Sequence, residues 1–576
     1  DGGKGDDDDD DIHAINGEDN DGDDDDVKNG DDTNDDDDDD DISNNEEDHK
    51  SGDLVVSEFH TNSNISHASD LKKYDNTPHL QTLQCEKYGG PSADLAAEMV
   101  YWWKIPSDEK FVNVFQKMHL EEKEEKYLIF EPDSAGFNNI RMSLETILTL
   151  GISMGRTIVL PPEKRIYLMW DSSNKQKHQF TFRDFFHLEE VEMEHFHLRF
   201  ISMKQYLERV AMKGLLKHKD TGNVIFPPMN RTDWNGVTDK VRNEMWEYVR
   251  NTSLMDETWK PMDSFSYFTA NTTDLGPKSR ENIQNLVNNV TKLDRAKYLG
   301  KAFPVDAPMF DRLKEHLIGR TKICFYDEKM QEAKSVHFKH DWQTGDRFLL
   351  PFYGFHFFED WKQDLWTKRF VRDHLHYSNE VFCVAARVVA ELRRRAKEQD
   401  PIGNDDGRFH TMHIRRGDFH QQYKGSIMTA EEMVNSSESI LDSHVSKTVF
   451  IASDEKDSNY FTPFKDKYEV YFLSNFTHLL EGVNSNYYPL IDQLISSRGD
   501  VFFGTQYSTF TSYINRLRGY YSWRDKLSGY KEGKIESYYF NPPHLKMKHQ
   551  KYFSIHQPLW AYAFPEVWYD IDKDVM

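Results

Sequence analysis

Two arginines and a histidine stand together at the end of an apolar run in the second half of the chain. Residues 409–414 read FHTMHI, which predicts a buried strand, and His413, Arg415 and Arg416 lie at or just beyond its carboxyl end. Open α/β sheets bind their ligands at the carboxyl ends of the strands. Because a guanidinium is planar, always charged and able to bond two oxygens at once, these residues predict a phosphate-binding site.

A second segment suited to binding an anion lies near residue 136. The pattern predicts a strand over 127–130, a helix through 140–152 and a strand over 156–160, with GFNNIR at the helix start. Gly136 permits close backbone approach, and the helix start offers its first N–H groups to an anion. An ordinary βαβ turn with a helix cap is the alternative explanation.

The third segment follows a strand predicted at 500–503 and opens a helix predicted at 509–518. Ser508 is a suitable N-cap, so its simplest role is to hold that helix. The same helix N–H groups and the hydroxyls of Ser508 and Thr509, beside Phe510, are also suited to a pyrophosphate.

Together the three segments resemble a known family. HIRRGDF at 413–419 is similar to the HxRRGDF signature of GDP-fucose protein O-fucosyltransferases and their plant and algal relatives. GFNNIR at 136–141 looks like the amino-terminal nucleotide-sugar loop of that family. Ser508-Thr509-Phe510 resembles its Ser/Thr-Phe element after a strand. Three segments in the right order make coincidence a poor explanation.

The resemblance implies a role for each matching residue. Arg415 would bond the β-phosphate and stabilise the departing GDP, so we expect it to be catalytic. Asp454, after a strand predicted at 448–452, would contact the nucleoside. An ion pair between Arg416 and Asp418 that shapes the turn is the alternative for Arg416. The expected substrate-binding residues are Gly136, Phe137, Asn138, Asn139, Arg141, His413, Arg416, Asp454, Ser508, Thr509 and Phe510.

The implied reaction is inverting transfer of fucose from GDP-fucose to a hydroxyl of a protein or glycan acceptor. Some members of the family carry a glutamate base just before the GFN-like turn, where this chain has Ala135. The acceptor proton then has three candidate destinations: phosphate, Asp133 or Glu131. No Asp-x-Asp-like metal cluster stands out in a structured part of the sequence. We therefore expect neither metal nor cofactor, with arginine and helix termini replacing a divalent ion.

Other functions fit the same segments. The wider family includes rhamnosyltransferases, so the donor could be another nucleotide-linked deoxysugar. The missing glutamate also leaves room for a nucleotide-sugar-binding or glycan-binding module without catalysis. The RGD tripeptides at 416–418 and 498–500 could suggest an adhesion ligand, but each adjoins a predicted strand, which argues against display on a loop.

The elements around these segments predict an α/β protein. The resemblance implies GT-B architecture, with two Rossmann-like domains facing a cleft. Residues 80–345 would form the amino-terminal, acceptor-side domain, in which 163–300 shows no clear βα rhythm and would carry insertions. Residues 346–576 would form the GDP-sugar domain. There the alternation is plain, with helices at 378–398, 429–444 and 488–497 and strands at 409–414, 448–452, 468–473 and 500–503.

Residues 1–79 are predicted to be a disordered, Asp-rich tail or stem. Residues 1–50 hold 26 acidic side chains and 3 lysines, whereas the formal charge of the whole chain is −28. The acidity therefore belongs to the tail, which cannot bury apolar surface and is typical of a solvated spacer. Binding of calcium or of a basic partner is the alternative. We expect no nucleic-acid partner.

The family resemblance implies the lumen of the Golgi or endoplasmic reticulum, and glycosylation sequons favour the secretory pathway, whereas the cysteines do not decide the compartment. The chain begins at Asp1 rather than Met, so we expect a membrane anchor upstream, although no run of 18 apolar residues occurs in the sequence itself. Cys85, Cys324 and Cys383 allow at most one intramolecular disulfide, and Cys383, in an apolar helical pattern, is predicted to be a buried thiol. Glycosylation sequons occur at Asn64, Asn230, Asn251, Asn271, Asn289, Asn435 and Asn475.

Overall fold

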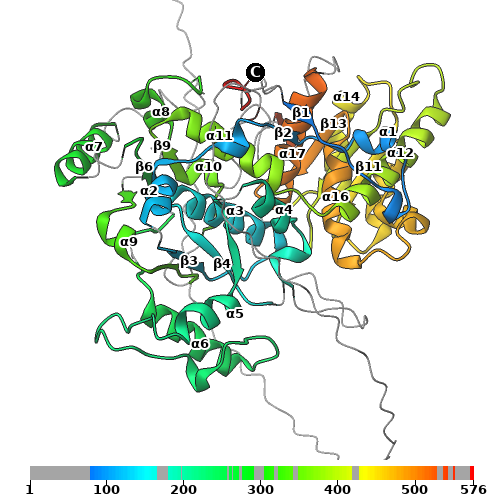
Figure 1. Ribbon diagram of the computed structural model, residues 1–576. Coiled ribbons are helices and arrows are strands. Elements are labelled where there is room, and N and C mark those ends of the chain that lie inside the picture. The colour runs from blue at the N-terminus through cyan, green and yellow to red at the C-terminus, as the bar shows by residue number, and fades with distance from the viewer. Residues whose placement is uncertain are drawn as a thin grey trace, which may run out of the picture. The chain divides into compact units, whose positions relative to one another are not determined.

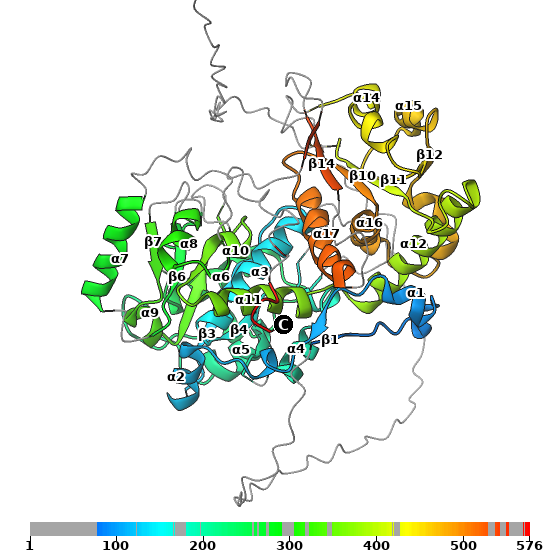
Figure 2. The same ribbon diagram turned by 90° about the horizontal axis from the view of Figure 1, so that it is seen from above.

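The computed structural model is a mixed α/β protein with parallel sheets, as predicted (Figures 1 and 2). The structure describes residues 78–122, 124–164, 166, 180–195, 197–255, 258–261, 264–271, 276–290, 304–316, 322–341, 348–417, 419, 427–527, 536–541, 549–551, 568 and 571–575. They all belong to one compact unit, Lys73–Met576. Of the predicted tail, residues 1–77 lie outside the described residues, and the domain boundary near residue 345 stays a prediction.

One parallel sheet is formed by strands of the amino-terminal half, in the order β5-β4-β3-β8. The strands are β3 (Tyr127–Phe130), β4 (Thr157–Leu160), β5 (Phe200–Ser202) and β8 (Ser335–Phe338). Helix α3 (Phe137–Ser153) leads from β3 to β4, which confirms the strand, helix and strand predicted here. The helices around this sheet are α2 (Val114–Glu122), α4 (Leu188–Glu194), α5 (Met203–Tyr206), α6 (Asp239–Thr252) and α9 (Glu328–Glu332).

A smaller parallel sheet lies partly in the region where the sequence showed no clear βα rhythm. Its order is β7-β6-β9, with β6 (Ser264–Phe268), β7 (Lys322–Phe325) and β9 (His356–Phe358). All residues of β6, which reads SFSYF, are buried. Serine and aromatic residues alternate along this short strand, but both of its faces are covered, so the alternation does not mark a half-exposed strand. The nearby helices are α7 (Pro277–Val290), α8 (Met309–His316), α10 (Phe352–Phe355) and α11 (Trp361–His374).

The carboxyl-terminal half forms a six-stranded sheet in the order β12-β11-β10-β13-β14-β15. Its strands are β10 (His410–Ile414), β11 (Thr448–Ser453), β12 (Glu469–Tyr471), β13 (Val501–Thr505), β14 (Glu536–Phe540) and β15 (His549–Lys551). All pairs are parallel except β14 with β15. The chain moves outward from β10 to β12 and returns on the other side of β10 with β13. The carboxyl ends of β10 and β13 therefore form a switch point, where such sheets bind ligands.

The predicted rhythm of this half is confirmed, with shifts of a few residues. The connecting helices are α12 (Asn379–Gln399), α14 (Ala430–Leu441), α15 (Thr462–Lys465), α16 (Tyr488–Ser497) and α17 (Thr509–Leu527). Strand β10 is wholly buried and its side chains alternate between the two faces of the sheet. Met412 and Ile414 pack in an apolar core that includes residues of α14, whereas Thr411 and His413 face α16 and α17. This alternation fixes which side of the sheet His413 reaches.

A disulfide joins the beginning of the described chain to the carboxyl-terminal half. Cys85 pairs with Cys383 of α12, with a Cα–Cα distance of 5.4 Å. The prediction of a buried thiol at Cys383 is therefore wrong, while Cys324 is buried and lies outside the disulfide. The apolar pattern around Cys383 correctly indicated burial. It could not indicate the partner, because nothing local shows which distant cysteine a helix face will meet.

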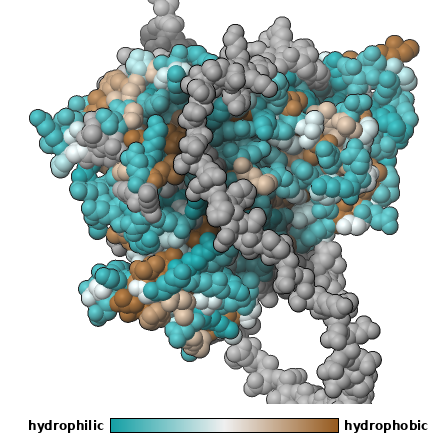
Figure 3. Space-filling view, in the orientation of Figure 1, coloured by the Kyte–Doolittle hydropathy of each residue, from teal (hydrophilic) through white to brown (hydrophobic). Residues whose placement is uncertain are grey.

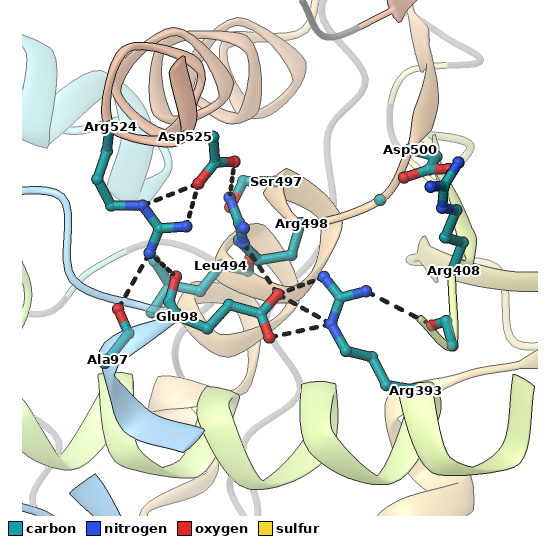
Figure 4. A network of polar contacts seen from close by, with 12 residues as sticks. Ala97, Glu98, Arg393, Arg408, Leu494, Ser497, Arg498, Asp500, Arg524 and Asp525 are labelled. Carbon is teal, nitrogen blue, oxygen red and sulfur yellow. Dashed lines mark hydrogen bonds and ion pairs between the residues drawn. The ribbon is translucent and has the colours of Figure 1, made fainter. Parts of the chain in front are cut away.

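Glu98, next to α1 (Ala93–Ala97), ties the same amino-terminal segment to α12 and to the β13 side of the sheet (Figure 4). Arg393 donates to both of its carboxylate oxygens, and the Nε of Arg498 lies 3.4 Å from Oε1. Burial acts against ionisation, but Arg393 and Arg498 prevail and lower the pKa of Glu98 to about 2. Arg498 also pairs with Asp525 at 3.3 Å. The RGD tripeptide at 498–500 is thus part of the internal structure.

The surface seen in Figure 3 is mostly hydrophilic, with hydrophobic residues in small, scattered patches. Among the residues that the structure describes, no helix is both long and apolar enough to cross a membrane. The short antiparallel pair of β1 (His79–Leu80) with β2 (Trp103–Lys104) completes the described elements.

Candidate active site

His413 connects the central strand β10 to the start of α17. Its Nδ1 lies 2.7 Å from the Oγ1 of Thr511, and its ring stacks on Phe510 with centroids 4.4 Å apart. Burial and the neighbouring Arg415 lower the pKa of His413 to about 3. The imidazole is therefore neutral at physiological pH, and its contacts bring the predicted segments around residues 413 and 510 together.

Arg415 is held at the carboxyl end of β10 by its backbone and by its side chain. Its N–H donates to the Oγ1 of Thr505 at 3.1 Å, and its guanidinium pairs with Asp454 at 2.8 Å. The Arg415 side chain is 21% exposed, so it remains reachable from solvent. Gly417 packs closely on this carboxylate, since a Cβ would lie 2.5 Å from the Oδ2 of Asp454.

Arg416 points to a different carboxylate. Its Nε donates to Glu455 at 2.6 Å, and its guanidinium lies 3.8 Å from the centroid of the Tyr460 ring. Arg416 therefore pairs with Glu455, whereas the alternative pair with Asp418 stays a prediction because Asp418 lies outside the described residues. Glu455 follows β11, so Arg416 bridges the ends of two adjacent strands.

A pocket opens against the two arginines. One wall carries guanidinium groups and the other is apolar. The pocket is lined by Arg415, Arg416, Phe419, Ile427, Met428, Met433, Thr505 and Phe540.

The loop between β13 and α17 has a strained backbone. Tyr507 has φ 62°, in the left-handed region that costs a non-glycine residue on the order of 1 kcal/mol. Ser508 is buried, and its carbonyl accepts the N–H of Ser512 in the first turn of α17. Thr509 and Phe510 begin the helix directly beside His413. The strained turn therefore aims the helix start at the end of β10.

Helices α3 and α17 are in contact with each other. Arg141 of α3 lies over the ring of Tyr513 of α17 at 3.5 Å, and one turn later Arg516 pairs with Glu145 at 2.6 Å. Residues at about the same distance from the two helix starts therefore meet. The start of α3 at Phe137 is consequently level with the start of α17, and the two predicted anion-binding helix ends open on the same side.

The residues of the GFNNIR segment have distinct surroundings. A Cβ on Gly136 would have no atom within 4 Å, which leaves room for close approach. The Oδ1 of Asn138 accepts the amide of Gln493 of α16 at 2.8 Å, and Phe137 packs on Phe185. Arg141 is 1% exposed and pairs with Glu145. Arg141 thus joins α3 to α17 instead of facing solvent, while Asn139 stays a predicted ligand at the first turn.

Comparison with known families tests the resemblance noted in the sequence. The sequence model described as GDP-fucose protein O-fucosyltransferase matches residues 127–521, more than half of the chain. The chain belongs to this family. The match runs from β3 into α17 and contains all three segments of the site. The protein is thus a glycosyltransferase of the fucosyltransferase class, with a nucleotide sugar as partner.

Three solved fucosyltransferase structures are similar to the chain at low identity. POFUT1 in complex with GDP is 13% identical and covers 68% of this chain and 94% of its own, with a TM-score of 0.27. NodZ α-1,6-fucosyltransferase co-crystallised with GDP is 12% identical and covers 73% of this chain and 98% of its own, with a TM-score of 0.29. A FUT1 variant of Arabidopsis thaliana in complex with GDP is 11% identical and covers 77% of this chain and 81% of its own, with a TM-score of 0.31. Among curated proteins, no sequence matches significantly.

One carboxylate at the site of this fucosyltransferase-family protein was missed by the sequence analysis. The carbonyl of Ser496 in α16 accepts the Thr411 hydroxyl at 2.7 Å. Asp492 lies four helix residues before Ser496, and His413 lies two strand residues after Thr411. Both steps span about 6 Å toward the carboxyl edge of the sheet, so Asp492 is level with His413. Burial raises the pKa of Asp492 to about 8, and its Oδ1 has no hydrogen-bond partner in the described part of the chain. An acidic residue inside the apolar run LIDQLI was the available signal.

The two carboxylates considered as bases are both engaged. Arg250 donates to both oxygens of Glu131, at 2.7 and 2.6 Å, and His337 lies 3.3 Å away. Although burial opposes them, His337 and Arg250 lower the pKa of Glu131, which makes it a poor base. Asp133 is buried, and its Oδ1 accepts the N–H of Ala135 at 2.7 Å.

Within the described ranges, no group of three or more His, Cys, Asp or Glu side chains is placed to hold a metal ion. The positive charge near the strand ends comes from Arg415 and Arg416 and from the start of α17.

Proposed function

We propose that the protein moves fucose from GDP-fucose to a hydroxyl of a protein or glycan, with inversion at the anomeric carbon. The observation that carries the proposal is the convergence of Arg415 with the start of α17 at the switch point of the sheet. A guanidinium and the first N–H groups of a helix are the two protein features best suited to a pyrophosphate.

Arg415 would act on the leaving group. When the bond between the anomeric carbon and the phosphate oxygen breaks, negative charge grows on GDP, and a fixed guanidinium stabilises that charge most strongly in the transition state. The pyrophosphate would compete with Asp454, 2.8 Å from the Arg415 guanidinium, for this contact. The partner exchange requires a shift of the arginine side chain and no movement of β10.

Asp492 is suited to recognise guanine. Guanine presents two adjacent donors, N1–H and N2–H, and a carboxylate accepts two parallel donors well. Asp492 carries an oxygen without a hydrogen-bond partner among the described residues and is level with His413. Asp454, the nucleoside contact expected from the sequence, is bound to Arg415 and to the N–H of Arg416. We therefore assign base recognition to Asp492.

We also propose that the reaction needs no cofactor and no divalent ion, because Arg415 and the helix start supply the positive charge that a metal would provide. The lumen of the Golgi or endoplasmic reticulum is the proposed location, with an anchor upstream of Asp1. The disulfide between Cys85 and Cys383 supports an oxidising compartment. The exposed sequon asparagines support it too, namely Asn230, Asn271, Asn289, Asn435 and Asn475.

The test is a donor panel assayed by nucleotide release and by calorimetric binding, each with and without EDTA. We expect GDP-fucose to bind and be cleaved in EDTA, with GDP as a competitor. Preference for UDP over GDP would move the assignment to a rhamnosyltransferase. Binding without cleavage, with every acceptor hydroxyl tried, would instead indicate a binding module. Loss of cleavage on chelation would refute metal independence.

A further inference from the structure

An aspartate, a histidine and a serine meet at the carboxyl edge of the amino-terminal sheet. Asp133 and Ser134 follow β3, and His340 follows β8, the strand paired with it. The Oγ of Ser134 lies 3.3 Å from the Nε2 of His340. The Nδ1 of the same ring lies 3.8 Å from the Oδ2 of Asp133. Both nitrogens of one imidazole thus face oxygens of one loop.

This loop leads into the start of α3. Because α3 and α17 are in register, with Arg141 over Tyr513 and Glu145 against Arg516, the start of α3 is level with the helix start beside His413. The loop therefore lies on the same side of the molecule as the proposed donor site. Ser134 is exposed and the His340 side chain is 13% exposed, so a hydroxyl from solvent can reach this place.

The contacts suit one tautomer of His340. The carboxylate of Asp133 favours a proton on Nδ1, which leaves the Nε2 lone pair directed at the Ser134 hydroxyl. An imidazole held in this way accepts a proton from a hydroxyl that takes the position of Ser134 Oγ. Contacts between catalytic groups are often long until substrate binds. The distances of 3.3 Å from Ser134 to His340 and of 3.8 Å from His340 to Asp133 are therefore compatible with proton transfer to the imidazole.

We propose that His340 is the general base of the transfer reaction and that Asp133 positions it, which rests on the fucosyltransferase function proposed above. The acceptor O–H bond breaks while its oxygen bonds to the anomeric carbon of fucose. The proton passes to the Nε2 of His340. The bond from the anomeric carbon to the phosphate oxygen breaks, and its electron pair leaves with GDP.

The charges around His340 fit this role. The carboxylate of Asp133 faces the His340 ring, and Glu131 is held by Arg250. Lys164 donates to the backbone carbonyl of Asp133 at 2.8 Å, and burial lowers the pKa of this lysine to about 8. Next to His340 in the chain, Lys339 and Asp341 pair with each other at 2.6 Å. The negative charge of Asp133 favours the protonated form of the ring after the transfer.

The experiment is the pH dependence of GDP-fucose hydrolysis, with water as the acceptor and GDP release as the readout. His340→Gln should lower kcat by about 100-fold or more and abolish its rise with pH. The KM for GDP-fucose and the affinity for GDP should stay within about twofold of wild type, because general bases contribute to the transition state rather than to donor binding. The matched control is His478→Gln, which changes an exposed histidine and should leave the profile unchanged.

Asp133→Asn separates positioning from folding. Asparagine keeps an oxygen that can accept the N–H of Ala135, but it removes the charge that faces His340. Losing a nearby negative charge lowers the pKa of an imidazole, so the midpoint of the kcat profile should move to lower pH.

Three outcomes would overturn the inference. One is a His340→Gln protein with normal kcat and the normal rise with pH. Another is a variant that loses GDP binding, which would make His340 a binding residue. The third is an Asp133→Asn profile with an unmoved midpoint. If wild-type protein neither binds nor cleaves GDP-fucose, the proposed function itself fails, and that result is distinguishable from all three.

Discussion

The Arg415 guanidinium and the Asp454 carboxylate lie 2.8 Å apart, and the same carboxylate accepts the backbone N–H of Arg416 at 2.7 Å. One aspartate after β11 therefore holds both the side chain and the turn after β10. Gly417 packs so closely on Asp454 that a Cβ would lie 2.5 Å from its Oδ2. This geometry keeps the guanidinium of Arg415 at the carboxyl end of β10.

Replacement of Arg415 should stop turnover without unfolding the protein. Arg415→Ala, and also Arg415→Lys, should lower kcat by about 100-fold or more, because an ammonium cannot reproduce the two parallel hydrogen bonds of a guanidinium. Steady-state release of GDP measures this effect, and the melting temperature reports folding. Arg394→Lys is the control, since Arg394 is an exposed arginine in a surface ion pair. Near-normal activity of Arg415→Ala would refute the mechanism.

Asp492→Asn should change stability and nucleotide binding in a pH-dependent way. The folded-state pKa of Asp492 is raised to about 8, above the value of an unfolded aspartate, so ionisation disfavours the folded state. Its stabilising contribution is full below about pH 4 and is lost as pH rises toward 8. Asp492→Asn should lack this loss in denaturant titrations. GDP affinity of wild type should rise from pH 6 to 8 as the carboxylate ionises, and the variant should bind weakly at both. Equal pH profiles for the two proteins would remove Asp492 from the site.

Glu145 should be important for stability because it bridges two buried arginines. It pairs with Arg141 and Arg516, and all three side chains are 1% exposed. Glu145→Gln leaves two guanidiniums without their shared counter-charge and should lower the free energy of unfolding by about 3–5 kcal/mol. Glu398→Gln, at an exposed pair with Arg394, should change it by about 1 kcal/mol or less. Chemical denaturation measures both. A loss below about 1 kcal/mol for Glu145→Gln would contradict its bridging role.

Removal of the disulfide should destabilise the protein, because the bond joins residues 298 positions apart in sequence. The double replacement Cys85→Ala with Cys383→Ala should lower the free energy of unfolding by about 2–4 kcal/mol. A reducing agent should lower the melting temperature of wild type but not that of the double variant. If reductant affects both proteins equally, the bond between Cys85 and Cys383 is not the redox-sensitive element.

The signals that sequence could supply are local ones. A run of apolar residues followed by His413, Arg415 and Arg416 predicts a strand and the chemistry at its end, because the direction of a strand and its last residues are properties of the same short segment. The same reasoning located the helix starts at Phe137 and Thr509. It missed β6, a five-residue strand whose serines are buried as fully as its aromatic residues, so that its alternation marks no solvent-exposed face.

Contacts between distant segments were decided only by the tertiary structure. The sequence could not show that Arg250 forms an ion pair with Glu131 or that Cys85 forms a disulfide with Cys383. It also could not show that His340 approaches Asp133. Each of these pairs depends on which faces of separate elements pack together, and local periodicity carries no information about that choice. The residue types at the site were therefore determined by the sequence alone. Packing of α3, α16 and α17 against the sheets that contain β3 and β10 decided which of these side chains are bound by other residues. It also decided which of them remain able to act on a substrate.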